Sequence, residues 1–303
     1  MELTDIQQIW QIWQIRQIRQ VQQIWQIPQS PQIQQLRLAR FTPLLKAGAL
    51  ELAILTGHLL LYPSGLVPER PRPVDADAPD PATPLAPPRR PVVLLHGFVD
   101  NRSVFVLLRR SLARHGWRHL AALNYSPLTC DLRAAAELLG RHVEAIRART
   151  GHEQVDVVGH SLGGLIARYY VQRLGGDARV RTLVTLGTPH SGTSLLPLAD
   201  AHPVIRQMRP GSEVLGELAA PSPGCRTRFV SFWSDLDQMM VPVETARLDH
   251  PDLQVHNVRV SGIGHLALPV HPAVVSGIRQ ALASDGLSVG GEDSGTNGAV
   301  SVA

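Results

Sequence analysis

The sequence predicts an α/β protein with a mainly parallel sheet and helices on both faces. Over residues 91–284, short apolar stretches typical of buried strands alternate with longer stretches of helical periodicity. The chain has 303 residues, of which 44% are hydrophobic and 18% charged, so it can bury one full-sized core. A glycine-flanked serine also stands between one such strand and the helix after it. Residues 91–284 are therefore predicted to form one catalytic domain.

The predicted strands are runs of valine, leucine and phenylalanine, and the predicted helices lie between them. The strands cover residues 92–95, 119–124, 154–158, 180–186, 229–233 and 255–260, and the helices cover 101–115, 131–149, 162–174 and 272–283. Residues 191–226 interrupt this alternation with scattered apolar positions, from Leu195 to Leu218. In an enzyme this insertion could form a lid over the site, or it could form connecting helices packed on the sheet.

The N-terminal segment, residues 1–35, has an apolar residue at every third position from Ile6 to Ile27. In an α-helix a stripe of period three slips by about 60° at each step and winds round the whole helix. No single face can then be buried. We interpret residues 1–35 as disordered low-complexity sequence.

Residues 36–62 combine basic side chains with an apolar run over residues 47–62. The basic residues are Arg37, Arg40 and Lys46. This polarity is typical of a signal peptide or signal anchor and indicates a cell-envelope or secreted protein, although a cytoplasmic location stays open. The apolar run is shorter than the roughly 20 residues of a spanning helix, and it carries Glu51 and His58. It could therefore also be an amphipathic helix that lies on a membrane or packs on the domain.

Two further segments have the composition of irregular chain. Residues 63–90 are rich in proline, aspartate and alanine, and are predicted to be a linker. Residues 285–303 are rich in glycine and serine, and are predicted to be a disordered tail.

The charge and cysteine content exclude some functions. The net charge is +4, but the basic residues are dispersed, so no nucleic-acid partner is expected. Cys130 and Cys225 cannot build a disulfide scaffold and match no zinc spacing. They could form one bond or remain free thiols.

Residues 155–164 read V-D-V-V-G-H-S-L-G-G, a buried strand followed by a sharp turn and a helix. Only small residues two before and two after the central serine leave room for such a turn, and Gly159 and Gly163 supply them. Ser161 is therefore predicted to project its hydroxyl above the sheet as a nucleophile. The N-terminus of the helix behind it would stabilise developing negative charge.

An oxyanion hole is predicted from the backbone N–H groups of Phe98 and Leu162. Phe98 follows a strand and a glycine turn, and Leu162 follows the nucleophile. His96, at the end of the same strand, precedes the nucleophile, so a role in shaping the loop is expected for it rather than catalysis.

The general base is predicted to be His265, because it follows a late strand in a glycine-flanked turn. The acid should follow an earlier strand, and both Asp235 and Asp237 come directly after residues 229–233. The strand pattern alone leaves either aspartate open.

Taken together, five motifs resemble those of the bacterial triacylglycerol lipases and related esterases of the α/β-hydrolase superfamily. The motifs are L-L-H-G-F at 94–98, G-H-S-L-G-G at 159–164, L-G-T-P-H-S-G at 186–192, S-D-L-D-Q-M-M-V-P at 234–242 and G-I-G-H at 262–265. The resemblance spans residues 91–283. The N-terminal repeat departs from it, and we find no paired aspartates of the kind a structural calcium site would need.

The resemblance implies a serine-dependent hydrolase of carboxylic esters with an acyl chain, acting through an acyl-enzyme and needing no cofactor or metal. Ser161 would be the nucleophile and His265 the base, while His190 in the third motif would be structural. Asp237 is preferred as the acid, since it resembles the family's acid position and lies far enough past the strand to turn back towards His265. A lipid ester substrate and membrane association through residues 47–62 would be consistent with this family.

Other functions remain open at this stage. The same triad could transfer the acyl group to another acceptor or cleave a thioester, because selectivity lies in the pocket. The scaffold could also serve as a non-catalytic binding module, or the N-terminal half could be an adaptor that carries a passive domain.

Overall fold

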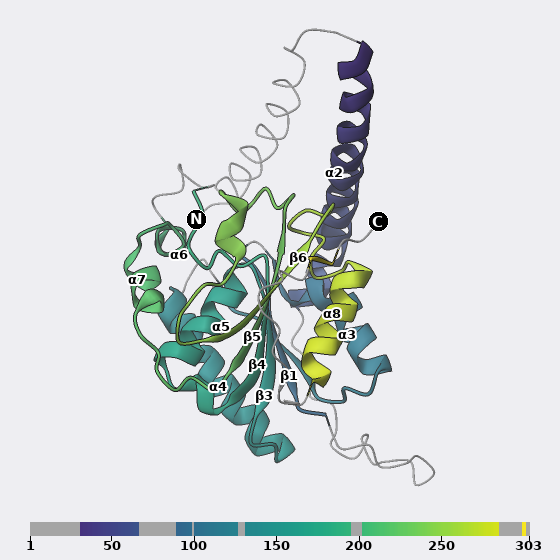
Figure 1. Ribbon diagram of the computed structural model, residues 1–303. Coiled ribbons are helices and arrows are strands. Elements are labelled where there is room, and N and C mark those ends of the chain that lie inside the picture. The colour runs from purple at the N-terminus through teal and green to yellow at the C-terminus, as the bar shows by residue number, and fades with distance from the viewer. Residues whose placement is uncertain are drawn as a thin grey trace.

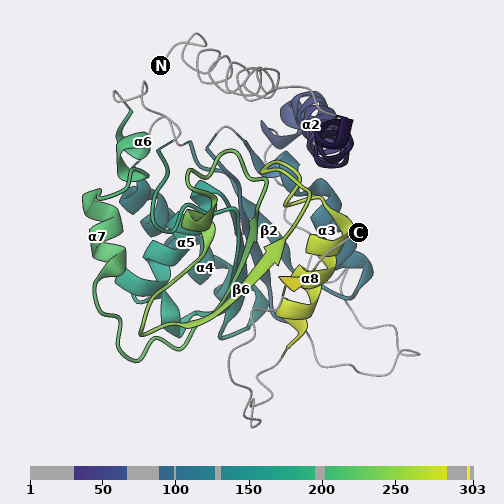
Figure 2. The ribbon, with the colours of Figure 1, turned by 45° about the horizontal axis from the view of Figure 1, so that its top comes forward.

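The computed structural model describes residues 31–66, 89–98, 100–126, 131–194, 202–284 and 299–300. Within these ranges a parallel sheet separates two layers of helices, as the sequence predicts (Figures 1 and 2). The strands are β1 (Val92–Leu95), β2 (Leu120–Leu123), β3 (Val155–His160), β4 (Val180–Leu186), β5 (Arg228–Ser234), β6 (Gln254–Val260) and β7 (Ala299–Val300). They lie in the order β2-β1-β3-β4-β5-β6-β7. All six pairings are parallel, so the loops that follow β1 to β6 gather at one edge.

Each face of the sheet has its own apolar core because side chains alternate along the strands. The helices that cover the faces are α3 (Val106–Arg114), α4 (Leu132–Thr150), α5 (Leu162–Arg173), α6 (Pro203–Gln207), α7 (Glu213–Ala219) and α8 (Pro272–Ala283), with 3₁₀ turns at Arg102–Phe105, Gly176–Ala178 and Val243–Ala246. In β1, Val93 and Leu95 pack in the core beneath α4 and α5, whereas Val92 and Leu94 pack in the core beneath α3 and α8.

The described part of the insertion at residues 191–226 forms packed helices. The buried side chains of α6 and α7 join the same core as those of α4 and α5; they are Val204, Ile205, Val214, Leu215 and Leu218. Arg168 of α5 holds α7 in place, because its guanidinium donates a hydrogen bond of 2.9 Å to the carbonyl of Leu218. Residues 202–226 therefore follow the packed-helix alternative, whereas Leu195, Leu196 and Leu198 lie outside the described residues.

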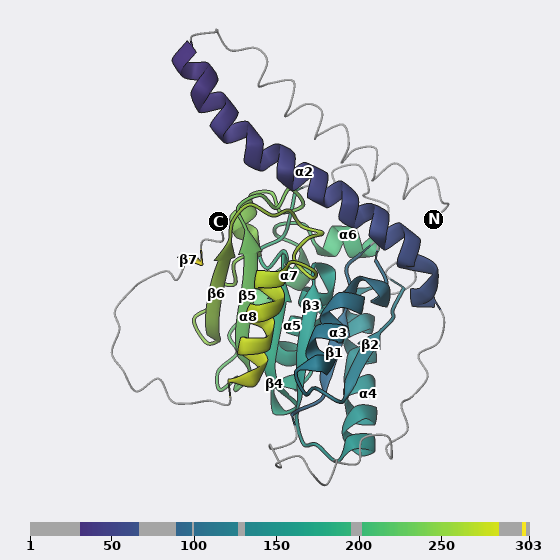
Figure 3. The ribbon, with the colours of Figure 1, turned by 90° about the vertical axis from the view of Figure 1, so that its right-hand side faces the viewer.

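Helix α2 (Pro31–Leu66) crosses the edge of the sheet at which the parallel strands end (Figure 3). It begins five residues inside the segment predicted to be disordered, 1–35, and runs four residues into the predicted linker, 63–90. Residues 1–30 and 67–88 lie outside the described residues. Segment Ala47–Leu66 is long and apolar enough to cross a membrane, and most of it is exposed on the molecule.

The helix continues past Pro63 because the domain satisfies its last carbonyl groups. The side-chain amide of Asn101 donates a hydrogen bond to the carbonyl of Tyr62 (2.9 Å), and that of Asn124 donates to the carbonyl of Gly65 (2.6 Å). Terminal helix carbonyls have no partner within the helix, so these bonds stabilise the last turn. The end of α2 is thus set by tertiary contacts that the local sequence does not reveal. Residues 299–300, in the tail predicted to be disordered, pair with β6.

Candidate active site

Ser161 stands in a strained turn between β3 and α5. Its φ of 53° and ψ of −121° make it the one residue other than glycine with a positive φ in the described part of the chain. Such a conformation costs on the order of 1–3 kcal/mol and persists only where the surroundings enforce it. The backbone N–H of Ser161 donates a hydrogen bond of 2.8 Å to the carbonyl of Leu186 at the end of β4. The turn is therefore held at the carboxyl edge of the sheet.

Two glycines let the turn close as the sequence predicts. A Cβ atom on Gly159 would lie 2.6 Å from the backbone of Gly164, so the strand and the helix could not approach with any larger residue. A Cβ atom on Gly163 would lie 2.4 Å from the carbonyl oxygen of Leu95, where β1 ends. The start of α5 therefore packs directly against the end of β1.

This packing brings the predicted oxyanion loop to the nucleophile. A Cβ atom on Gly97, the residue before Phe98, would lie 3.3 Å from the Cβ atom of Ser161. Leu162, the other predicted donor, is the first residue of α5. The chain segments that carry the two N–H groups named from the sequence therefore meet at Ser161.

His96 shapes this loop, as the sequence predicts. Its Nδ1 donates to the carbonyl of Gly97 (2.8 Å), and its ring stacks on that of Tyr125 with centroids 4.3 Å apart. Burial lowers the pKa of His96, so the ring stays neutral and fixed within the loop.

The loop after β5 delivers Asp237 to His265. Asp237 is fully buried, and its Oδ2 lies 2.8 Å from Nδ1 of His265. The other oxygen, Oδ1, accepts hydrogen bonds from the backbone N–H groups of Met239 (2.9 Å) and Met240 (3.2 Å). The carboxylate is therefore held on both oxygens, and it orients the imidazole through Nδ1.

Asp235, the other aspartate considered as the acid, faces away from this pair. Its carboxylate forms an ion pair with Arg259 at 2.9 Å and accepts a hydrogen bond from the backbone of Gly262 at 3.4 Å. It joins two loops at the surface, whereas Asp237 contacts His265. Of the two aspartates, Asp237 is thus the one that contacts His265.

The electrostatic surroundings of His265 favour its protonated form. Burial by itself lowers the pKa of this imidazole, but the carboxylates of Asp237, Glu51 and Asp100 raise it, and the net result is a pKa above the usual value. A buried base with a carboxylate partner is the arrangement that general base catalysis requires.

Comparison with known proteins identifies the fold. The alpha/beta hydrolase fold family matches residues 90–218 of this chain, which include β1, the nucleophile turn and α5. The chain has the α/β-hydrolase fold. The mature lipase BlEst2 of Bacillus licheniformis superposes with a TM-score of 0.55 at 16% identity, over 67% of this chain and 96% of that one. Lipase B of Aspergillus fumigatus gives 0.56 at 17% identity, over 65% and 53%.

Two curated bacterial relatives, both described as triacylglycerol lipases, match part of this chain. The one from Pseudarthrobacter phenanthrenivorans is 32% identical over 113 residues, which is 35% of this chain and 34% of that protein. The one from Burkholderia plantarii is also 32% identical over 113 residues, or 35% and 31%. The match thus spans about a third of the length of each relative.

Four polar residues around the α/β-hydrolase site had no assigned role from the sequence. The rings of His160 and His265 lie 4.7 Å apart, and Nδ1 of His160 lies 3.4 Å from Oδ2 of Asp100. Asp100 also faces His58 of α2, at 3.9 Å. Burial would raise the pKa of Asp100, but the neighbouring histidines outweigh burial and lower it. The fourth residue, Glu51, is considered below.

His190 is structural, as the resemblance implies. It is buried, with Nε2 at 3.0 Å from the hydroxyl of Thr185. Burial and the neighbouring Arg168 guanidinium hold its pKa well below the usual value, so it carries no charge. Cys225 is a free thiol, and Cys130 lies outside the described residues. No group of three or more metal-ligating side chains occurs within the described ranges.

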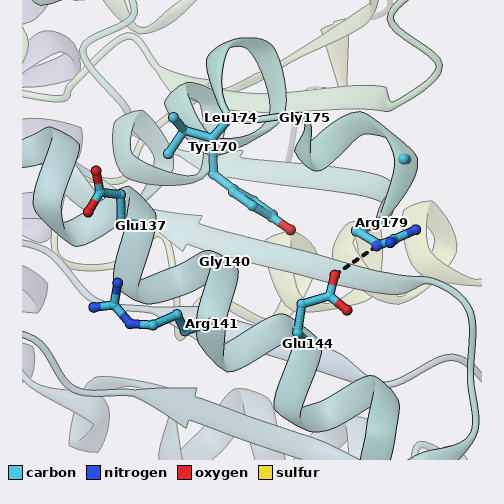
Figure 4. Close-up of a pocket in the computed structure, with 9 residues that line it drawn as sticks. Glu137, Gly140, Arg141, Glu144, Tyr170, Leu174, Gly175 and Arg179 are labelled. Atoms are coloured by element: carbon cyan, nitrogen blue, oxygen red, sulfur yellow. Dashed lines mark hydrogen bonds and ion pairs between the residues drawn. The ribbon is translucent and has the colours of Figure 1, made fainter.

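A hollow lies at the far end of α5 from Ser161 (Figure 4). Its lining includes Tyr170, Arg179 and Glu144, and the last two form an ion pair at 2.7 Å. Helix α5 has 12 residues and so places this hollow on the order of 18 Å from the nucleophile turn. It is separate from the triad.

Proposed function

We propose that the chain is a serine-dependent carboxylic ester hydrolase that acts through an acyl-enzyme intermediate. The observation that carries the proposal is the buried hydrogen bond of 2.8 Å between Asp237 and His265, at the sheet edge where Ser161 is held in its strained turn. The nucleophile follows β3, the orienting acid follows β5 and the base follows β6. This is the chain order typical of the fold.

The proposed reaction gives each of these groups one role. Because Nδ1 of His265 bonds to Asp237, Nε2 is left to take the proton of Ser161 as its hydroxyl attacks the ester carbonyl. The backbone N–H groups of Phe98 and Leu162 would stabilise the oxyanion, each lowering the barrier by about 3 kcal/mol. His265 then passes the proton to the departing alcohol and later activates the water that releases the acid.

A lipid ester is the proposed substrate class. The two curated relatives carry the name triacylglycerol lipase, and Leu-rich α2 crosses the sheet edge from which the loops after β3, β5 and β6 emerge. Hydrolysis of p-nitrophenyl esters from acetate to palmitate, below and above their solubility limits, would separate a lipase from an esterase of soluble substrates. Product analysis with an added alcohol or a thioester substrate would reveal acyl transfer or thioester cleavage instead.

The decisive experiment is Ser161→Ala. Turnover is expected to fall by about 10⁶, because attack by the serine oxygen is lost while binding remains. A fluorophosphonate probe should label the wild type at this serine. Ser194→Ala, at an exposed serine, is the matched control and should keep both activity and labelling. Labelling or hydrolysis that survives Ser161→Ala would contradict the proposed function.

We also propose that α2 binds an anionic bilayer at the cell envelope through its outer face. The face is formed by exposed apolar side chains, among them Leu52, Leu59, Leu60 and Leu66, which are 59%, 62%, 77% and 65% exposed. Exposed apolar side chains that gather in one place mark membrane or protein interaction sites on soluble proteins. Arg37, Arg40 and Lys46 precede it on the same helix and would attract anionic lipid.

Flotation of the protein with phosphatidylglycerol vesicles tests this proposal. The double variant Leu59→Ser/Leu60→Ser should bind at least about tenfold more weakly, because two exposed leucines no longer enter the bilayer. Leu174→Ser, at an exposed leucine beyond the end of α5, is the control and should bind like the wild type. Unchanged binding of the double variant would refute the membrane role. A change in oligomeric state without a change in flotation would do so too, and would assign this face to contacts between copies.

A further inference from the structure

We propose that Glu51, which lies on α2 and outside the α/β-hydrolase domain, is a positioning residue for the loop that carries His265. This inference rests on the proposed function of Ser161, His265 and Asp237. It assigns to α2 a part in the active site itself, in addition to its outer apolar face.

The contacts of Glu51 run to the two residues that follow the base. Oε2 accepts a hydrogen bond from the backbone N–H of Leu266 (3.1 Å), and Oε1 accepts one from that of Ala267 (2.9 Å). The Glu51 side chain is buried, with only 7% of the residue exposed. An ionised carboxylate is the side chain that accepts with both oxygens at once. The backbone just after His265 is therefore fixed by a helix far away in the sequence.

The loop itself has room for this carboxylate only because of a glycine. A Cβ atom on Gly264, the residue before His265, would lie 2.4 Å from Cδ of Glu51. Gly264 has no positive φ, so backbone conformation does not require a glycine there. Close approach of Glu51 is the requirement that accounts for it. Gly264 on the loop and Glu51 on α2 are thus matched to each other at this contact.

Two carboxylates hold His265 at different points. Asp237 binds the ring through Nδ1, and Glu51 binds the backbone on the C-terminal side of the same residue. A base must be held close to its productive position, since a displacement of about 1 Å can cost about 100-fold in rate. Removing either support is therefore expected to affect turnover more than substrate binding.

Glu51 also acts on His265 through its charge. The charged and titratable groups that face His265 are Asp237 after β5, Asp100 after β1, His160 at the end of β3 and Glu51 on α2. The net pKa of Glu51 is raised: burial, helped by the Asp237 carboxylate, outweighs the bonds from Leu266 and Ala267 and the nearby imidazole, which lower it. In its ionised form it favours the imidazolium, so its removal should lower the pKa of His265.

The experiment compares Glu51→Gln with Glu137→Gln, the same chemical change at an exposed position of α4, in the full chain. Gln places an NH₂ group against one of the two backbone donors and removes the charge. We expect kcat on a soluble p-nitrophenyl ester to fall about tenfold with KM changed less than about twofold. The acidic limb of the kcat/KM profile should move to lower pH. Glu137→Gln should match the wild type in all three quantities.

Two further variants keep the test sharp if Glu51→Gln folds poorly. Gly264→Ala should displace the Glu51 carboxylate and lower kcat, although residue 51 itself is not substituted. Glu51→Asp keeps the charge on a shorter arm, so the acidic limb should stay closer to that of the wild type than in Glu51→Gln. Fluorophosphonate labelling of Ser161 reports that the site is folded in each variant.

A lower melting temperature with unchanged kcat and pH profile in Glu51→Gln and Gly264→Ala would overturn the inference, because Glu51 would then only anchor α2. Failure of the proposed function has a different signature. It would appear as activity that persists in Ser161→Ala, whatever the Glu51 variants do.

Discussion

The loop after β5 and helix α2 each supply one buried carboxylate to the same short segment. Asp237 of the loop contacts the His265 ring at 2.8 Å, and Glu51 of the helix contacts the backbone N–H groups of Leu266 and Ala267 at 3.1 and 2.9 Å. The loop connects two strands of the parallel sheet, β5 and β6, whereas the helix precedes the sheet in the chain and lies across its edge.

The two regions differ in what brings each of them to the site. Strand order in the parallel sheet places the β5 loop beside the β6 loop, so any chain that folds this way brings the two together. Helix α2 reaches the site through side-chain contacts, among them those of Glu51, Asn101 and Asn124. The first region is built by topology and the second by docking, and docking can be weakened without unfolding the sheet.

Asp237→Asn should produce the largest effect on this comparison. An amide at this position can hold the imidazole in the wrong tautomer, and turnover is then expected to fall by about 10⁴ while the fold remains intact. Asp235→Asn should lose mainly the surface ion pair with Arg259, at a cost of about 1 kcal/mol or less. Turnover and melting temperature of both variants provide the measurement. Loss of turnover in Asp235→Asn instead would reverse the assignment of the acid.

The pH dependence of the wild type should show how the carboxylates of both regions together shift the pKa of His265. The base acts only when neutral, and the carboxylates of Asp237, Glu51 and Asp100 raise the pKa of His265 above its ordinary value of 6.5. The value of kcat/KM should therefore rise with pH and reach half of its plateau above pH 6.5. An assay on a soluble ester between about pH 5 and pH 9, which brackets the ordinary pKa of histidine, measures this limb. A midpoint clearly below 6.5 would mean that burial outweighs these carboxylates.

The sequence predicted the part of the site that topology builds. Alternating strands and helices, the glycines around Ser161 and the late glycine-flanked His265 are local patterns, and each residue stands where its pattern indicates. The acid was harder to assign, because Asp235 and Asp237 share one loop and only the contact with His265 separates them.

The docking contacts had a weaker sequence signal. Glu51 and His58 stood out as polar residues in an apolar run, and one proposed alternative was a helix packed on the domain. Their partners could not be identified, since Leu266 lies 215 residues further along the chain. The end of α2 was also placed too early, because the amides of Asn101 and Asn124 that extend it come from distant loops.

Gly65→Ala should have the smallest effect and tests whether α2 is docked at its C-terminal end. A Cβ atom on Gly65 would lie 1.9 Å from Oδ1 of Asn101, a side chain that also accepts a hydrogen bond from Ser103. Asn101 would have to move and give up its bond to the carbonyl of Tyr62, which should lower stability by about 1–3 kcal/mol and change turnover only a few-fold. Gly57→Ala is the matched control, because no atom lies within 4 Å of its added Cβ and alanine favours the helix by about 1 kcal/mol. Thermal unfolding should therefore shift down for Gly65→Ala and stay level or rise for Gly57→Ala. Equal upward shifts would show that this end of α2 is free of Asn101, and the helix would then lose the support that keeps Glu51 against the His265 loop.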